Sequence, residues 1–105
     1  MNYRKVIAID FDGTLCKSEY PVILKPKKRV IKRAIKEQER GALLILWTCR
    51  EGRELAEAIK WCRSHGLIFD AINSNPTEQI RTFGTDPRKI GADEYWDDKS
   101  RRIIF

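Results

Sequence analysis

Short runs of apolar residues alternate along the chain with longer segments in which apolar residues recur every three or four positions. The short runs are rich in Val, Ile and Leu and are bounded by charged or turn-forming residues, a pattern typical of buried β-strands. The two strongest are Lys5–Asp10 and Ala42–Thr48. Three further strands are predicted at Leu67–Ile72, at Ala92–Trp96 and, along a sheet edge, at Arg101–Phe105.

The longer segments have the apolar spacing of amphipathic helices. One covers Lys27–Arg40 and is followed by Gly41, a residue that commonly ends helices. A second covers Glu51–His65, and its acidic first half suits the positive end of a helix dipole. A shorter helix is predicted at Thr77–Phe83. Residues 14–26 contain two prolines and no sustained period, which indicates a loop or a small hairpin.

Strands that alternate with helices predict an α/β fold in three layers, with a parallel sheet covered by helices on both faces. The 105 residues are enough for one domain, residues 1–105. Apolar residues make up 42% of the chain and charged residues 34%, which excludes a disordered or a collagen-like chain. No run approaches the roughly 18 apolar residues that a membrane-spanning helix needs.

The cysteines and the N-terminus indicate a cytoplasmic protein. Cys16, Cys49 and Cys62 cannot all pair within one chain, and the sequence contains no Cys-x-x-Cys. Reduced thiols are typical of the cytosol. The first ten residues lack the apolar stretch and the cleavage site of a secretion signal.

The net charge of +6 is concentrated in the first 41 residues, which hold 11 Lys and Arg against 5 Asp and Glu. The remaining residues hold 10 of each sign. A basic segment can attract a polyanion or a phosphorylated substrate. It can equally be the solvated face of an amphipathic helix, which is the commoner case.

Polar residues follow the predicted strands. Ligands of parallel sheets bind at the carboxyl ends of the strands. The residues at these ends are Asp10 with Asp12, Thr48, Asn73, and Asp97 with Asp98. Four carboxylates at one edge repel one another unless a positive charge lies among them. Mg²⁺ binds oxygen ligands and often joins one or two carboxylates to a substrate phosphate, so we expect Mg²⁺ and a phosphorylated substrate.

The spacing of the first pair adds to this expectation. On extended chain, Asp10 and Asp12 project to the same side while Phe11 projects to the other. One carboxylate can then face the reacting phosphorus while the other reaches the leaving group. Gly13 permits a sharp turn that brings backbone N–H groups close to an oxyanion.

Three segments resemble, in the correct order, motifs of the haloacid dehalogenase-like phosphohydrolase superfamily. Residues 10–15, Asp-Phe-Asp-Gly-Thr-Leu, resemble its first motif, D-x-D-G-T-[LV]. Leu44–Thr48 is similar to the second, an apolar strand closing on Thr or Ser, and Tyr95–Asp98 resembles the fourth, which closes on paired Asp. The resemblance covers nearly the whole chain. It implies a Rossmann-like core and a phosphatase that hydrolyses phosphate monoesters.

The resemblance also implies roles for the matching residues. Asp10 would be the nucleophile that forms an aspartyl phosphate. Asp12 would be the general acid for the leaving alcohol and then the base for the hydrolytic water, and its backbone carbonyl would bind the metal. Thr48 would hydrogen-bond a phosphoryl oxygen. Asp97 and Asp98 would join Asp10 in binding Mg²⁺.

The third motif of the superfamily is a Lys or Arg ahead of the fourth. Lys89 is preferred for this role over its neighbour Arg88, and the alternative is that both are surface charges. Five residues beside the motifs are candidates for lining the substrate pocket: Gly13, Thr14, Cys49, Arg50 and Asn73.

Three of these five have competing interpretations. Arg50 suits a substrate phosphate or carboxylate, and it suits packing at a helix end equally well. Asn73 precedes a Pro-containing loop, where asparagine often shapes a turn. Cys49 adjoins the site, but position 55 is Leu, where a phosphate-binding thiol enzyme would need Arg.

Members of the superfamily usually carry a cap domain after the first or second motif. Residues 15–47 and 49–96 are filled by predicted helices and strands, so we expect a core without a cap and an open site. In the superfamily, such members act on macromolecules or close the site by forming oligomers. A small molecule, a nucleic-acid end and a second copy of the chain therefore all stay open as partners, and no membrane partner is expected.

Two other functions would use the same scaffold. One is a catalytically idle or receiver-like phosphate-binding module, although receiver domains carry their acceptor Asp after the third strand, where this chain has Asn73. The other is a metal-dependent nuclease, which would cleave a phosphodiester. Both acids of the first motif are present, which favours the phosphatase.

Overall fold

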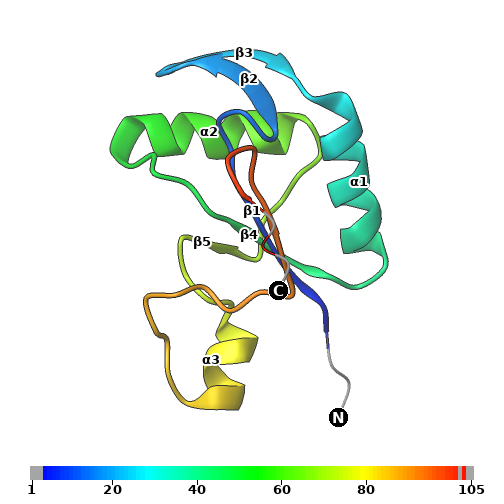
Figure 1. Cartoon of the computed structure of the whole chain (residues 1–105), viewed down its shortest axis with the longest axis vertical. Coiled ribbons are helices and arrows are strands. Elements are labelled where there is room, and N and C mark those ends of the chain that lie inside the picture. Colours follow the sequence, from blue (N-terminus) through cyan, green and yellow to red (C-terminus); the bar gives the residue numbers. More distant parts are fainter. Residues whose placement is uncertain (1–3, 102, 104–105) are drawn as a thin grey trace.

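The computed structural model describes residues 4–101 and 103. Four strands form one sheet in the order β5-β4-β1-β6, and every neighbouring pair is parallel. Three helices flank this sheet, which confirms an α/β fold built on a parallel sheet (Figure 1). The sheet strands are β1 (Val6–Ile9), β4 (Leu43–Leu46), β5 (Ala71–Ile72) and β6 (Glu94–Trp96).

The helices lie where the apolar spacing predicts them. They are α1 (Lys28–Glu39), α2 (Gly52–Ser64) and α3 (Thr77–Phe83). Gly41 follows α1 with φ at +101°, a left-handed conformation that costs glycine little and lets the chain turn back toward the sheet. Within the described residues, no helix has the length and apolar character required to cross a bilayer.

All four residues of β1 are buried, and they alternate between two separate clusters of apolar side chains. Ile7 and Ile9 pack on the face covered by residues of α1 and α2, including Ala34 and Ala58. Val6 and Ala8 belong to the cluster on the opposite face. Burying a large aliphatic side chain contributes about 1.5–3 kcal/mol, so β1 anchors both halves of the core.

The second face of the sheet is covered differently from the first. α3 lies apart from α1 and α2 and has no buried residue (Figure 1). The buried contact on this face comes from Ile90, which packs with Leu43 and Ile45 of β4. Three helices flank the sheet, but a connecting segment and no helix residue supplies the buried packing on this face within the described chain. The prediction of helices packed on both faces is therefore shown only in part.

Residues 14–26 contain an antiparallel hairpin of β2 (Cys16–Glu19) and β3 (Val22–Pro26). This agrees with the predicted loop or small hairpin. The hairpin lies over α2 and leads directly into α1 (Figure 1). Between the first motif and α1, the described chain has no room for a cap domain.

The predicted strands are longer than those of the structure. Lys5–Asp10 and Ala42–Thr48 each lose one or two residues at their ends, and two others differ for local reasons. β5 has only two residues because the Asp70 side chain takes the place of a backbone partner, accepting a hydrogen bond from Leu44 N to its Oδ2 at 2.7 Å. β6 begins at Glu94, two residues later than predicted. Residues 102, 104 and 105 of the predicted last strand lie outside the described residues, and Arg101 and Ile103 belong to no strand.

Candidate active site

The strand order reverses at β1, and this places the candidate site. The chain moves from β1 outward to β4 and β5, then returns to form β6 on the other side of β1. Ligands of open parallel sheets bind at the carboxyl ends of the strands where such a reversal occurs. Ile9 is paired with Trp96, and Asp10 N donates to Trp96 O at 2.8 Å. Asp10 and Asp97 therefore leave the sheet side by side.

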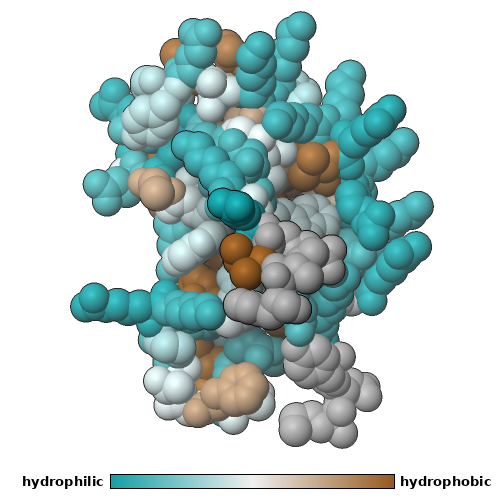
Figure 2. Space-filling model, in the orientation of Figure 1, coloured by the Kyte–Doolittle hydropathy of each residue, from teal (hydrophilic) through white to brown (hydrophobic). Residues whose placement is uncertain are grey.

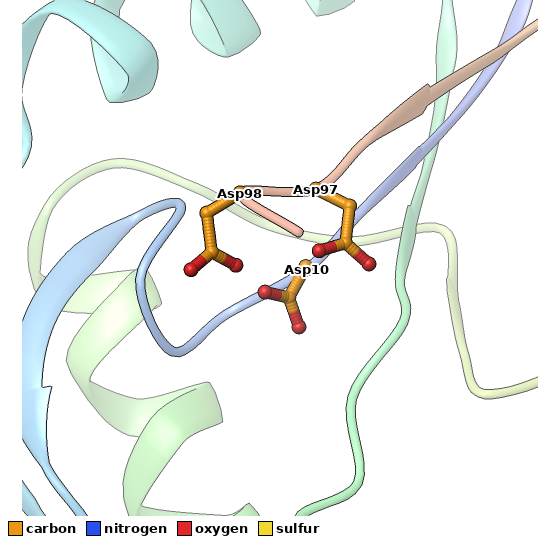
Figure 3. Close-up of side chains that lie close together, drawn as sticks. All are labelled: Asp10, Asp97 and Asp98. Carbon is orange, nitrogen blue, oxygen red and sulfur yellow. The ribbon is translucent and has the colours of Figure 1, made fainter. Parts of the chain in front are cut away.

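Asp10, Asp97 and Asp98 converge at this edge (Figure 3). Each offers a carboxylate oxygen, and these oxygens all lie within 4.8 Å of one another. Asp10 is half-buried, and the other two are exposed. Burial, with repulsion from Asp97, raises the pKa of Asp10 to about 6.

Thr14 joins the two loops that carry these acids. Its Oγ1 donates to Asp10 Oδ2 at 3.2 Å and accepts from Asp98 N at 3.0 Å. Gly13 precedes it with φ at +87°, and a Cβ at this position would collide with the Asp98 carboxylate. The tight turn after β1 is therefore needed both for the backbone conformation and for the space that Asp98 occupies.

The three acids fit a hard divalent cation. Oxygen donors from two loops converge, and no Lys or Arg of the described residues forms a salt bridge with any of them. Mg²⁺ takes such carboxylates and completes its coordination with water or phosphate oxygens. Bound cations also relieve the repulsion that now raises the pKa of Asp10.

Asp12 stands apart from this group. Its carboxylate forms a bidentate ion pair with Arg50, with Nη2 to Oδ1 at 2.7 Å and Nε to Oδ2 at 2.8 Å. Ser18 Oγ donates to Oδ1, also at 2.7 Å. The Arg50 hydrogen bonds, joined by the one from Ser18, hold the pKa of Asp12 below its usual value.

The spacing predicts that Asp10 and Asp12 project to one side, and this stays a prediction. In the structure the Asp12 carboxylate binds Arg50 and is not part of the group of three acids. The alternation holds only on extended chain, and the chain bends at Phe11, whose carbonyl accepts from Thr14 N and Leu15 N. The extended strand therefore ends before Asp12, and the bend directs its carboxylate to Arg50.

Arg50 is 1% exposed and does not line the pocket beside the acids. Its guanidinium lies 5.0 Å from the ring centroids of both Phe11 and Tyr20, and it donates to Pro21 O at 3.1 Å. Of the two interpretations of Arg50, packing describes its position in this structure. The hairpin and the loop after β4 are joined through it.

The Asn73 side chain joins the turn after β5 to the loop after β4, whereas the Thr48 side chain bonds within its own loop. Thr48 N donates to Asn73 Oδ1 at 2.8 Å, and Thr48 Oγ1 accepts from Arg50 N at 3.1 Å. Asn73 has φ at +52°, so it also shapes the turn after β5, the alternative weighed for it. Cys49 is exposed between Thr48 and Arg50.

Lys89 and Arg88 are exposed on the segment between α3 and β6. Neither forms a salt bridge or hydrogen bond within the described part of the chain. Their neighbour Ile90 packs on Val6 and Leu43, the first residues of their strands, and so at the amino ends of the sheet. The structure does not bring Lys89 to the acids.

Two of the three acids, Asp97 and Asp98, line a pocket of about 430 Å³. The sequence did not predict most of its other lining residues. Three missed residues are cations from the start of α1, and two are apolar. Arg29 and Arg33 are four residues apart and share a helix face, which the basic run could have indicated. The lining residues are Gly13, Thr14, Lys27, Arg29, Val30, Arg33, Trp96, Asp97 and Asp98.

No protein-family model matches the sequence, and no curated protein matches it either. Among solved structures, a conserved protein coded by a locus of Bacteroides thetaiotaomicron is similar to it, with a TM-score of 0.80 and 39% sequence identity. The similarity covers 93% of this chain and 78% of that one. The description of that protein names no activity. At this identity and coverage, the chain belongs to the same family as the conserved Bacteroides thetaiotaomicron protein.

Proposed function

We propose that the protein is a Mg²⁺-dependent phosphatase of the haloacid dehalogenase-like superfamily, which hydrolyses a phosphate monoester through an aspartyl phosphate on Asp10. The observation that carries this proposal is the convergence of Asp10, Asp97 and Asp98 where the strand order reverses. Numbered by their order in the chain, the four parallel strands follow one another across the sheet as third, second, first and fourth. This order is compatible with a Rossmann-like core and supports the proposal. The resemblance assigns the nucleophile to Asp10 in the first motif and metal binding to Asp97 and Asp98 in the fourth.

Asp10, Asp97 and Asp98 would hold Mg²⁺, and the resemblance adds the backbone carbonyl of Asp12. When bound, the ion supplies charge neutralisation at the transferring phosphoryl group. Thr14 fixes the relative position of Asp10 and Asp98 through its hydroxyl. This preorganisation is the main contribution that a protein makes to phosphoryl transfer.

In the first half-reaction, Asp10 attacks phosphorus with a carboxylate oxygen. A new O–P bond forms as the bond to the leaving alcohol breaks, and the alcohol takes a proton from Asp12. The pKa of Asp10, raised to about 6, leaves this group mostly ionised at neutral pH, as a nucleophile requires. Thr48, at the end of β4, would hydrogen-bond a phosphoryl oxygen.

In the second half-reaction, water attacks the aspartyl phosphate, Asp12 accepts its proton, and inorganic phosphate leaves with Asp10 restored. Arg50 and Ser18 keep Asp12 ionised in this structure, which is the protonation state that a base needs. Donation to the leaving group needs the protonated acid. The proton that Asp12 accepts from water in the second half-reaction is the one that it donates to the alcohol in the next cycle, and the ion pair with Arg50 must open for Asp12 to carry it.

The test is turnover of p-nitrophenyl phosphate by the full chain with Mg²⁺ and with EDTA. Asp10→Asn removes the nucleophile and should lower kcat by at least about 10³-fold, as loss of a nucleophile commonly does. Glu39→Gln is the matched control because Glu39 is exposed and its side chain forms no hydrogen bond or ion pair within the described chain. Mass spectrometry of acid-quenched enzyme should find a phosphate adduct on the peptide that contains Asp10.

Equal turnover by wild type and Asp10→Asn would refute the nucleophile assignment. Phosphate binding without turnover would favour the idle, receiver-like module. Faster cleavage of bis-p-nitrophenyl phosphate than of the monoester would favour the nuclease.

A further inference from the structure

The pocket beside the acids has a second, positively charged wall. Lys27, Arg29 and Arg33, from the start of α1, line the pocket that Asp97 and Asp98 border from the other side. Figure 2 shows hydrophilic side chains projecting along the side of the molecule where α1 lies. One pocket therefore combines a site suited to a cation with a wall suited to an anion.

Few acidic side chains of the described chain pair with the cations of the positive wall. Lys27 and Arg29 form no salt bridge among the described residues, and Arg33 has only a long one, 3.8 Å from Nε to Glu37 Oε1. Arg29 and Arg33 are four residues apart on one helix, where like charges destabilise the helix. An arrangement that weakens the fold and faces a pocket is best explained by a bound anion.

The wall is longer than one phosphate. From Lys27 to Arg33 the helix rises about 9 Å, at about 1.5 Å per residue. Lys27 lies at the near end, where its Nζ donates to Gly13 O at 2.5 Å, in the loop after β1. The transferring phosphate, held beside Asp10, can use Lys27. Arg29 and Arg33 then face a different part of the substrate.

We propose that Arg29 and Arg33 bind a second anionic group of the substrate, so that the substrate is a small phosphate ester that carries another acidic group. This inference rests on the proposed phosphatase function. The volume of about 430 Å³ suits a small molecule. Val30 and Trp96 also line the pocket and add an apolar surface, against which a short carbon skeleton can pack.

The test compares two esters of equal size. In 3-phosphoglycerate a carboxylate replaces the terminal hydroxymethyl group of glycerol 3-phosphate. Wild type should have a kcat/KM about tenfold higher for 3-phosphoglycerate, because a hydrogen bond to a charged group contributes at least that factor. The double variant Arg29→Gln/Arg33→Gln should lose this preference, chiefly through a higher KM for 3-phosphoglycerate.

The control is Lys28→Gln/Lys32→Gln, which removes the same charge from exposed positions of α1 that do not line this pocket. It should keep the wild-type preference. Two results would overturn the inference. One is an equal fall in kcat/KM for both esters in the arginine variant, and the other is an equal kcat/KM for both esters in wild type.

Binding measurements separate this inference from the proposed function. Calorimetry on Asp10→Asn with Mg²⁺ should show the same tenfold preference in Kd for 3-phosphoglycerate. A preference in binding without turnover in wild type would refute the phosphatase and leave the second anionic subsite standing. Turnover with no preference in rate or binding would refute the second anionic subsite and leave the phosphatase standing.

Discussion

Arg50 carries a permanent positive charge in a position that water hardly reaches. A buried guanidinium is costly unless it is paired and its donors are satisfied. The Asp12 carboxylate and the Pro21 carbonyl accept its hydrogen bonds, and its Cζ lies 5.0 Å from the ring centroids of Phe11 and Tyr20. Arginine rather than lysine is required here, because only the planar fork can bind both carboxylate oxygens and stack on a ring.

Arg50→Lys should therefore lower the free energy of unfolding by about 2 kcal/mol. Breaking a fully buried pair costs more, but Asp12 is 30% exposed and can regain water. Urea unfolding followed by circular dichroism measures the change. Arg53→Lys, on the exposed surface of α2, should cost less than about 0.5 kcal/mol. Equal losses in the two variants would mean that the fork and stacking add no stability.

Some site residues could be placed from the sequence, and others could not. Asp10 and Asp97 follow strands, and parallel neighbours end at one edge, so strand assignment alone brings them together. The orientation of Asp12 could not be predicted in this way, because it depends on where the extended chain stops. The partner that binds Asp12 is 38 residues away, and no local pattern in the sequence connects the two.

The pairing of β6, at the sheet edge, with β1 shows how elements far apart in sequence are held in register. Lys5 Nζ, just before β1, lies 2.7 Å from Glu94 Oε2, on the first residue of β6. Trp96 Nε1 donates to the other Glu94 oxygen at 3.0 Å. The hydrogen bond from Lys5 and then that from Trp96 lower the pKa of Glu94. This contact fixes the strand that carries Asp97 and Asp98.

The lowered pKa gives the pH dependence a definite sign. A depressed acid pKa contributes stability that is present above the unfolded-state pKa of about 4.5 and is lost as the pH falls through the folded-state pKa. Glu94→Gln should lower the free energy of unfolding by about 0.5 kcal/mol at pH 7, since solvent screens this exposed pair, and by less at pH 3. Thermal unfolding at both values measures this.

Glu57→Gln is the control for this prediction, because Glu57 is exposed on α2 and has no ion pair in the described chain. Its effect should be the same at both values of pH. A Glu94→Gln deficit that is equally large at pH 3 would show that packing, not charge, holds β6 to Lys5.

The ends of an element could be predicted where the local signals agree. The apolar spacing and Gly41 place both ends of α1 to within a residue or two, because they indicate the same helix. β5 could not be bounded, because the Asp70 side chain replaces a strand partner. Nor could the sequence show that Arg29 and Arg33 face the acids, since that depends on how the crossover from β1 to β4 packs α1 on the sheet.

At the scale of the whole molecule, the charges of the candidate site lower the stability of the fold. Three carboxylates converge where β1 meets β6, and the Thr14 hydroxyl joins the two loops that carry them. At neutral pH the repulsion among the acids favours separation of the strands that carry them. A bound cation reverses the sign of this contribution. Stability and metal binding are therefore linked through the same three side chains.

This linkage predicts that Asp10→Asn raises the stability relative to wild type in EDTA and lowers the gain in stability from Mg²⁺. In EDTA, Asp10→Asn should be more stable than wild type by about 1 kcal/mol at pH 7.5, because one of three clustered charges is removed from a half-buried position. That corresponds to a rise in Tm of about 4–8 °C for a chain of this size. In saturating Mg²⁺, wild type should gain stability with the logarithm of the ion concentration, and the variant should gain much less. The Glu39→Gln control keeps all three acids and should follow wild type in both buffers. If Asp10→Asn is less stable in EDTA, or if it gains as much from Mg²⁺ as wild type does, then Asp10 is a structural residue and the acids do not form a common cation site.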